Sequence, residues 1–195
     1  MRLFLAIDLD DAAREAAAAW SQALSTQLGI AAREIKWVPP DNLHLSLHFF
    51  GELDDAHRAT VTRALGDPYE TRAFAIALTN AGVFPPTGAP RVIWLGIRET
   101  ADTATASTQL IYREVQARLT PLGLQETTTR GFTPHLTIGR VRTPGAALGR
   151  AIREALRVTP APSPTFSVSH LTLYQSRLSP KGPSYIPIAR FPLRH

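Results

Sequence analysis

Apolar and polar residues alternate with a period of two in several short stretches of the chain, the pattern of strands with one buried face. The stretches that fit this pattern are 2–9, 35–39, 43–51, 74–84, 91–97, 135–141 and 166–176. A last stretch, 184–193, contains prolines and suits a sheet edge better than a sheet centre. Helical periodicity predicts helices near 11–28, 54–66, 103–120 and 146–157. Because strands and helices are interspersed along the whole chain, we expect an α+β fold.

The order of these elements repeats after a turn-rich segment, PPTGAP at 85–90. LHLSL at 43–47 aligns with PHLTI at 134–138, 91 positions later, and LFLAI at 3–7 aligns with IWLGI, 90 positions later. The repeat predicts a single domain, 1–195, built of two pseudo-symmetric lobes of about 1–88 and 89–195, between which chain segments can be exchanged. We expect each lobe to be an antiparallel-rich sheet with two helices on its outer face, and an active-site cleft between the two sheets.

Each half of the repeat carries a histidine followed two positions later by a hydroxyl side chain. His44 precedes Ser46, and His135 precedes Thr137. Residues i and i+2 of a strand point to the same face, about 6.5–7 Å apart. Each lobe is therefore expected to present an imidazole beside a hydroxyl, while the apolar residues between them, and Phe49, point into the core.

Two other histidines lie in similar surroundings. The stretch His170-Leu-Thr-Leu looks like a third copy of the motif, but its counterpart in the repeat is Leu78, so we expect no catalytic role for it. His48 has the strand parity of His44 but lies about 13 Å further along, so we expect it at the rim of the cleft.

Two imidazoles that face one cleft form an acid–base pair. With an ordinary pKa near 6.5, one ring can be neutral while the other is protonated at neutral pH. The neutral ring would accept a proton from an attacking water or hydroxyl, the charged ring would donate one to the leaving oxygen, and the two hydroxyls would hold phosphate oxygens. This chemistry needs no metal or other cofactor, and the sequence has neither cysteine nor an Asp/Glu–His cluster at metal-ligand spacing.

Composition limits the binding partners and the cellular compartment that we expect for the protein. The formal net charge is +5 and nearly all of the 21 basic residues are arginines; this indicates either a phosphate-rich partner or merely a composition rich in arginine. No apolar stretch approaches the ~18 residues of a membrane span, and the absence of cysteine fits a reducing compartment. We expect a cytoplasmic monomer with no membrane association and no obligate protein partner.

The motifs and their flanks resemble the bacterial and archaeal RNA 2′,3′-cyclic phosphodiesterase family, also called the 2′-5′ RNA ligase family, within the two-histidine (2H) phosphoesterases. The resemblance covers nearly the whole chain and rests on RLFLAIDL, NLHLSLHFFGE, VFPP, PRVIWLGI, FTPHLTIGRVR and LYQSRLSPKGPSY. It implies hydrolysis of RNA 2′,3′-cyclic phosphate ends to 2′-phosphate ends without a cofactor, and reversible 2′-5′ RNA ligation as an accompanying activity.

The resemblance also implies residue roles: proton donor His44, proton acceptor His135, and phosphate-binding Ser46, Thr137 and Arg140. Ser46 stands where the family usually has threonine; it keeps the hydroxyl but lacks the stiff β-branched side chain. Arg140 has the strand parity of the core-facing residues before it, so it reaches the cleft only if the strand ends or bulges at Gly139.

Two other functions stay open. The chain fits another 2H enzyme that acts on small cyclic nucleotides or 2′-5′ linkages, or a non-catalytic RNA-binding module on the same scaffold; two titratable histidines favour an enzyme, because binding alone does not need them. Phe4 and Trp94, which align in the repeat, and Tyr185 either stack an RNA base or pack in the core. Basic residues near the second motif and in the C-terminal stretch LYQSRLSPKGPSY either contact RNA or form a solvated face. They are Arg130, Arg142, Arg177 and Lys181.

Overall fold

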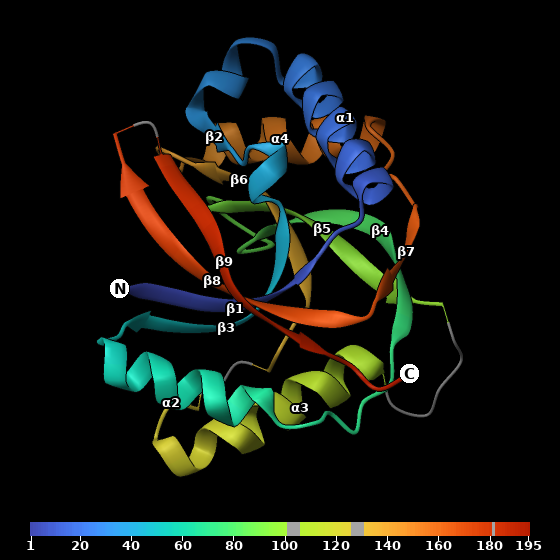
Figure 1. The fold of residues 1–195 in the computed structure, drawn as a ribbon. Coiled ribbons are helices and arrows are strands. Elements are labelled where there is room, and N and C mark those ends of the chain that lie inside the picture. The colour runs from blue at the N-terminus through green and yellow to red at the C-terminus, as the bar shows by residue number, and fades with distance from the viewer. Residues whose placement is uncertain (101–105, 126–130, 181) are drawn as a thin grey trace.

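The structure is a computed structural model that describes residues 1–100, 106–125, 131–180 and 182–195 (Figure 1). Its strands are β1 Arg2–Asp8, β2 Ile35–Trp37, β3 His44–Glu52, β4 Phe74–Phe84, β5 Val92–Glu99, β6 His135–Val141, β7 Thr165–Val168, β8 His170–Ser179 and β9 Gly182–Pro192. Its helices are α1 Asp11–Leu28, α2 Asp55–Gly66, α3 Ser107–Leu119 and α4 Ala146–Val158, with short 3₁₀ helices η1 Gly29–Glu34, η2 Pro40–Asn42 and η3 Thr120–Leu122. The expected elements are confirmed, except that the strand expected at 166–176 is interrupted at Ser169 and that 103–105 lie outside the described residues.

The residues that flank helix α1 explain where it begins and where it ends. The Asp10 side chain accepts a hydrogen bond from the Ala13 amide at 2.8 Å, and this N-cap satisfies a donor of the first turn. The helix ends at Gly29, whose φ of 55° is open to glycine at little cost. Its buried residues recur every three or four positions: Ala13, Ala17, Trp20, Leu24 and Leu28.

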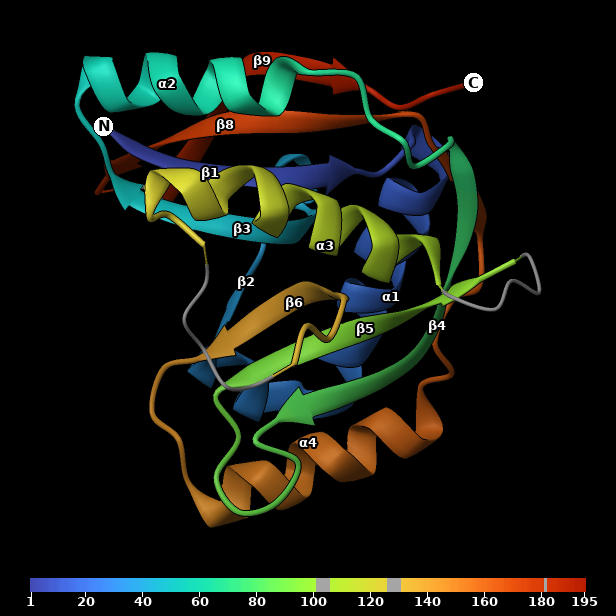
Figure 2. The ribbon, with the colours of Figure 1, turned by 90° about the horizontal axis from the view of Figure 1, so that it is seen from below.

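All strand pairs of the nine-stranded sheet are antiparallel, in the order β7-β4-β5-β6-β3-β1-β8-β9, with β2 paired to β6. Each half of this path takes strands from both halves of the sequence, since β4 lies beside β5 and β8 lies beside β1. Strand β9 ends the path, which confirms the expected edge strand. The sheet is curled (Figures 1 and 2), and the α+β expectation is confirmed.

The helices cover the outer surface of the curled sheet in two pairs. Helix α1 contacts α4, and α2 contacts α3, on opposite sides of the molecule (Figures 1 and 2). The Trp20 indole donates to the carbonyl of Thr159 after α4, and Arg118 on α3 donates to the carbonyl of Leu65 on α2. Apolar residues that face the helices, such as Leu3, Leu5 and Leu95, are fully buried, so the polar side chains of the same strands point to the inner surface. Among the described residues, no helix is both long and apolar enough to cross a membrane.

Strands β3 and β6 meet at the centre of the sheet through one pair of Cα partners, Leu45 and Leu136. In an antiparallel pair, this register places His44 opposite Thr137 and His135 opposite Ser46. The two histidines are then diagonal neighbours, roughly 7–8 Å apart. The two motifs therefore meet on one face of the sheet.

Both central strands contain a bulge at equivalent positions. Pairing with β1 passes from His48 directly to Ser46, and pairing of β6 with β5 passes from Gly139 directly to Thr137, so Leu47 and Ile138 are the extra residues. A bulge reverses the side-chain alternation that follows it. The expected core position of Phe49 is therefore wrong, because its side chain is 59% exposed. The expected rim position of His48 is wrong for the same reason, because it is only 2% exposed.

Candidate active site

The imidazoles of His44 and His135 are tethered in the same way. Nδ1 of His44 lies 2.7 Å from the carbonyl oxygen of Asn42, and Nδ1 of His135 lies 2.8 Å from that of Thr133. A carbonyl only accepts hydrogen bonds, so Nδ1 carries the proton and donates in both rings. Nε2 is then the atom that gains or loses a proton in each ring. No pattern in the sequence marks these tethers, because they depend on the turn before each strand.

The surroundings of His44 are aromatic and partly charged. Its ring centroid lies 4.7 Å from that of Phe4 and 5.2 Å from that of Tyr185. Burial is the largest influence and lowers the pKa of His44; the hydrogen bond to Asn42 and the charge of Asp8 oppose it, and the charge of Arg140 adds to the lowering. His44 therefore loses its proton more readily than an exposed histidine does.

The surroundings of His135 are built from different strands. The Phe84 ring meets His135 edge-on at 5.1 Å between centroids, and the Trp94 ring stacks on Phe84 at 5.1 Å. The expected alignment of Phe4 with Trp94 is wrong. Phe4 pairs with Phe49, which corresponds to Arg140 in the second half of the repeat, but Trp94 pairs with Thr137 instead of Arg140. The two halves of the site thus share their central motifs but not their aromatic neighbours.

The three expected phosphate-binding residues lie on β3 and β6 as the motifs require. Ser46 and Thr137 are half-buried, and Arg140 is exposed. The bulge at Ile138 and Gly139 returns Arg140 to the face of Thr137, which meets the condition set by the sequence. The charge of Arg140 lowers the pKa of His44 and offsets part of the rise that burial causes in the pKa of Tyr185.

The family model of the 2′-5′ RNA ligase superfamily matches residues 9–179. The chain belongs to this superfamily. RNA 2′,3′-cyclic phosphodiesterase of Archaeoglobus fulgidus is 32% identical over 95% of this chain and 96% of its own length. The protein of the same name from Methanothermobacter thermautotrophicus is 32% identical over 99% of both chains.

Solved structures of the superfamily have the same fold. The protein TT0787 of Thermus thermophilus superposes with a TM-score of 0.74 at 27% identity, covering 100% of this chain and 98% of its own. E. coli LigT complexed with 3′-AMP gives a TM-score of 0.74 at 25% identity with the same coverage. These comparisons confirm the resemblance that the motifs indicated and the expectation of an enzyme from this family.

Sequence reasoning missed a polar cluster beside His44. Asp8 is the Cα partner of His44 on β1, and its carboxylate accepts hydrogen bonds at 2.7 Å from both Thr172 and Tyr174 on β8. His170, the third motif histidine, places Nε2 3.3 Å from the same carboxylate. Its companion Thr172 is buried and bonded to Asp8, so this motif does not present a free hydroxyl as the other two do. The only sequence signal was a carboxylate at the end of an apolar strand.

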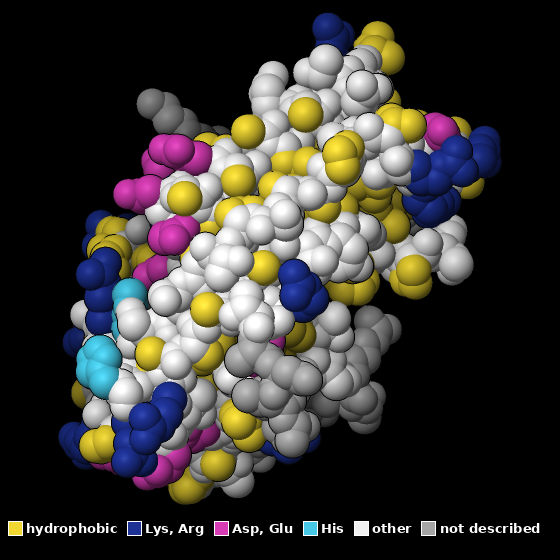
Figure 3. Space-filling model, turned by 90° about the vertical axis from the view of Figure 1, so that its right-hand side faces the viewer, with side chains coloured by type: hydrophobic (Ala, Val, Ile, Leu, Met, Phe, Trp, Pro, Cys, Tyr) yellow, Lys and Arg dark blue, Asp and Glu magenta, His cyan; other side chains and the backbone are white. Residues whose placement is uncertain are grey.

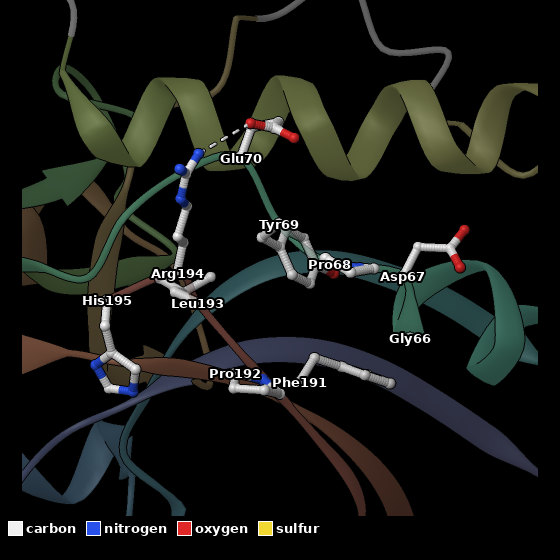
Figure 4. Close-up of a pocket in the computed structure, with 10 residues that line it drawn as sticks. All are labelled: Gly66, Asp67, Pro68, Tyr69, Glu70, Phe191, Pro192, Leu193, Arg194 and His195. Atoms are coloured by element: carbon white, nitrogen blue, oxygen red, sulfur yellow. Dashed lines mark ion pairs between the residues drawn. The ribbon is translucent and has the colours of Figure 1, made fainter.

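Hollows adjoin the site on both sides. One of about 440 Å³ is lined by Arg2, Phe4, Phe49, Gly51, Ser176, Leu178, Pro183 and Tyr185, next to His44. Another, of about 570 Å³, is lined by Phe84, Pro85, Pro86, Arg91 and Val92, next to His135. The pocket in Figure 4, of about 630 Å³, is lined by residues 66–70 and 191–195, among them Glu70 and Arg194, which form an ion pair at 3.5 Å. Neither His44 nor His135 lines it.

The positive charge does not collect in one place on the face of Figure 3, where basic side chains lie at separate points. Of the basic residues expected to flank the site, Arg142 and Arg177 are exposed, while Arg130 and Lys181 lie outside the described residues. In the part of the chain that the structure describes, no three His, Asp or Glu side chains form a group that could hold a metal ion.

Proposed function

We propose that this protein hydrolyses the 2′,3′-cyclic phosphate at the end of an RNA strand to a 2′-phosphate and a 3′-hydroxyl. The observation that carries the proposal is the pair of imidazoles of His44 and His135. Each is tethered through Nδ1 to a backbone carbonyl, and they lie diagonally across the β3–β6 seam, the place where these two strands pair. It is supported by relatives of nearly equal length named RNA 2′,3′-cyclic phosphodiesterase. We propose further that residues 1–195 act as one domain, without a protein partner.

In the proposed reaction a water molecule attacks phosphorus in line with the departing 3′-oxygen. Nε2 of neutral His135 accepts the proton of the attacking water, and the bond from phosphorus to the 3′-oxygen breaks. Nε2 of protonated His44 donates its proton to that oxygen, so the product is a 2′-phosphomonoester. An RNA 5′-hydroxyl in place of water would give a 2′-5′ linkage by the same proton transfers.

Hydroxyl and guanidinium groups stabilise the transition state in this scheme. Ser46 and Thr137 lie on the same face as the imidazoles and donate to the non-bridging oxygens, where negative charge increases during attack. Arg140 adds a charge-assisted hydrogen bond from the rim. These donors are fixed on adjacent strands, so little reorganisation is needed when charge develops.

The acid must lie on the ribose side of the phosphorus, because the leaving 3′-oxygen belongs to that ribose. The hollow on the His44 side offers exposed aromatic surface from Phe49, with Phe4 and Tyr185 behind it. We place the terminal nucleoside there, its base stacked on Phe49. Water then approaches from the His135 side.

Product analysis tests the proposal. An oligonucleotide that ends in a 2′,3′-cyclic phosphate should be converted to the 2′-phosphate form at an unchanged rate in excess EDTA, while a matched 3′-phosphate oligonucleotide stays intact. A 3′-phosphate product, or loss of activity on chelation, would contradict it. Faster turnover of ADP-ribose 1″,2″-cyclic phosphate would favour a small-nucleotide enzyme, and RNA binding without turnover would favour a binding module.

A further inference from the structure

We propose that Asp8 breaks the near-symmetry of the site and assigns the proton-donor role to His44, because its carboxylate faces that imidazole while the described residues place a glycine, Gly96, at the equivalent position beside His135. This inference rests on the proposed function and deepens it. Asp8 acts through His44 and is therefore a positioning residue rather than a catalytic one.

The carboxylate of Asp8 is held rigidly towards the site. As Cα partners on antiparallel strands, Asp8 and His44 have Cβ atoms about 4.5–5.5 Å apart. One carboxylate oxygen accepts from Thr172 and the other from Tyr174, each at 2.7 Å. The side chain is 19% exposed, so solvent screens its charge less than that of a surface carboxylate.

His44 needs a nearby negative charge to hold a proton. Burial among Phe4 and Tyr185, and the positive charge of Arg140, both disfavour the imidazolium. The titratable and charged groups that face it from neighbouring strands are Asp8 on β1, Arg140 and His135 on β6, and Tyr185 on β9. Within this described set Asp8 alone is a carboxylate, and its charge raises the pKa of His44 against the effect of burial.

The other half of the site has a glycine at the position that corresponds to Asp8. Gly96 pairs with His135 as Asp8 pairs with His44. A Cβ at Gly96 would collide with the side-chain oxygen of Asn80. The two halves therefore differ at this position by one carboxylate, and that carboxylate offsets part of the burial effect that disfavours the protonated form of His44.

Groups around Asp8 modulate its charge without cancelling it. Burial and the hydrogen bond to Asp8 raise the pKa of Tyr174, so this phenol stays a neutral donor. The charges of Arg14 and Arg190 reach Tyr174 from α1 and β9. His170 lies 3.3 Å from the carboxylate and would offset part of its charge when protonated.

The direct test is an NMR titration of the His44 ring in the wild-type protein, Asp8→Asn and Asp11→Asn. Asparagine keeps the shape of Asp8 and an acceptor for one of its donors but removes the charge, so the pKa of His44 should fall. Asp11 is an exposed carboxylate on α1, and its variant removes an equal formal charge and should leave His44 unchanged. An unchanged His44 in Asp8→Asn would overturn the proposal, even with a lower melting temperature, since that result indicates a structural role alone.

The pH dependence of kcat/KM is the second readout. If His44 is the acid, its pKa sets the alkaline limb, so Asp8→Asn should move that limb to lower pH and reduce activity there roughly tenfold, at the lower end of a neighbouring charge effect. The acid limb should stay in place, because Asp8 lies beside His44 and not beside the other histidine. Movement of the acid limb instead would overturn the assignment of His44 as the donor.

Failure of the Asp8 proposal and failure of the proposed function can be told apart. Tyr174→Phe keeps the carboxylate and removes one donor, so the pKa of His44 should rise or stay; a fall would overturn the proposal, and this holds even if Asp8→Asn does not fold. If the wild-type protein cleaves no cyclic phosphate, the proposed function fails, while the NMR titration still decides whether Asp8 acts on His44.

Discussion

Leu45 and Leu136 lie 91 positions apart in the sequence and face each other as Cα partners across the β3–β6 seam. Because the partners occupy the same position in the two motifs, the seam relates the motifs by a local twofold axis. Each histidine is consequently opposite the hydroxyl residue of the other motif, so each imidazole has its facing hydroxyl on the neighbouring strand.

The first prediction concerns the two histidines. His44→Ala and His135→Ala should each lower kcat/KM by about 10²–10⁴-fold, since each removes one proton transfer. His170→Ala should cost little, because that ring contacts Asp8 rather than the phosphate site. His195→Ala, at an exposed chain end, is the control for losing an imidazole. A loss in His170→Ala as severe as in the other two would contradict the assignment.

The second prediction concerns the hydroxyls. Thr137→Val keeps the β-branched shape and removes the donor, so kcat should fall roughly 10²–10³-fold if the hydroxyl stabilises developing charge. Thr137→Ser and Ser46→Thr keep a hydroxyl and should stay near the wild-type rate. Single-turnover kinetics separate a slower chemical step from weaker substrate binding. A change confined to KM would indicate that the Thr137 hydroxyl contacts the substrate only in the ground state.

The third prediction concerns base stacking on Phe49. Phe49→Ala should raise KM for a cyclic-phosphate oligonucleotide by about 5–100-fold, the usual range for one lost base–aromatic stack. Phe49 is 59% exposed, so folding should be unaffected. Phe49→Tyr keeps the ring and is the matched control. Equal KM values in all three proteins would move the nucleoside out of this hollow.

Strand and helix positions could be predicted because periods of two and 3.6 record which face is buried. The motif histidines could also be predicted, because the repeat marked them twice. The parity argument failed beyond Leu47, where one extra residue reverses inside and outside for His48 and Phe49. Nothing in the alternation of residues marks such a bulge.

The contacts of Asp8 could not be predicted from the sequence for a different reason. Its partners Thr172 and Tyr174 lie more than 160 positions away, on a strand that joins β1 only in the folded sheet. Its asymmetry with Gly96 becomes visible only in the strand register, because the sequence alignment of the repeat is displaced by two residues on β1 and β5.

The fourth prediction concerns His48 and acid stability. Burial lowers the pKa of His48 to about 4, against 6.5 for an exposed histidine, and the Gln116 amide nitrogen lies 3.1 Å from Nδ1. Between pH 6.5 and 4 the unfolded chain takes up this proton and the folded chain does not. The free energy of unfolding should therefore fall by up to about 3 kcal/mol as pH drops through this window.

Urea unfolding at pH 7 and at pH 4.5 checks this. The variant His48→Gln should be less stable than the wild type at pH 7 but show a smaller loss on acidification. His195→Gln, which removes an imidazole at an exposed position, is the matched control. Parallel curves for wild type and His48→Gln would show that His48 is not the titrating group.

The fifth prediction concerns the bulge that orients Arg140. A Cβ at Gly139 would lie 2.7 Å from Cγ2 of Ile35, so Gly139→Ala should push β2 from β6 and cost about 1–3 kcal/mol of stability. It should also lower kcat/KM, because the displaced bulge carries Arg140 away from the phosphate. Gly66→Ala, at the end of α2, has open space around its Cβ and should lower neither quantity. Combining Gly139→Ala with Arg140→Gln should lower kcat/KM no further than Arg140→Gln alone, since both remove one interaction; additive losses would show that the bulge acts on the site by another route.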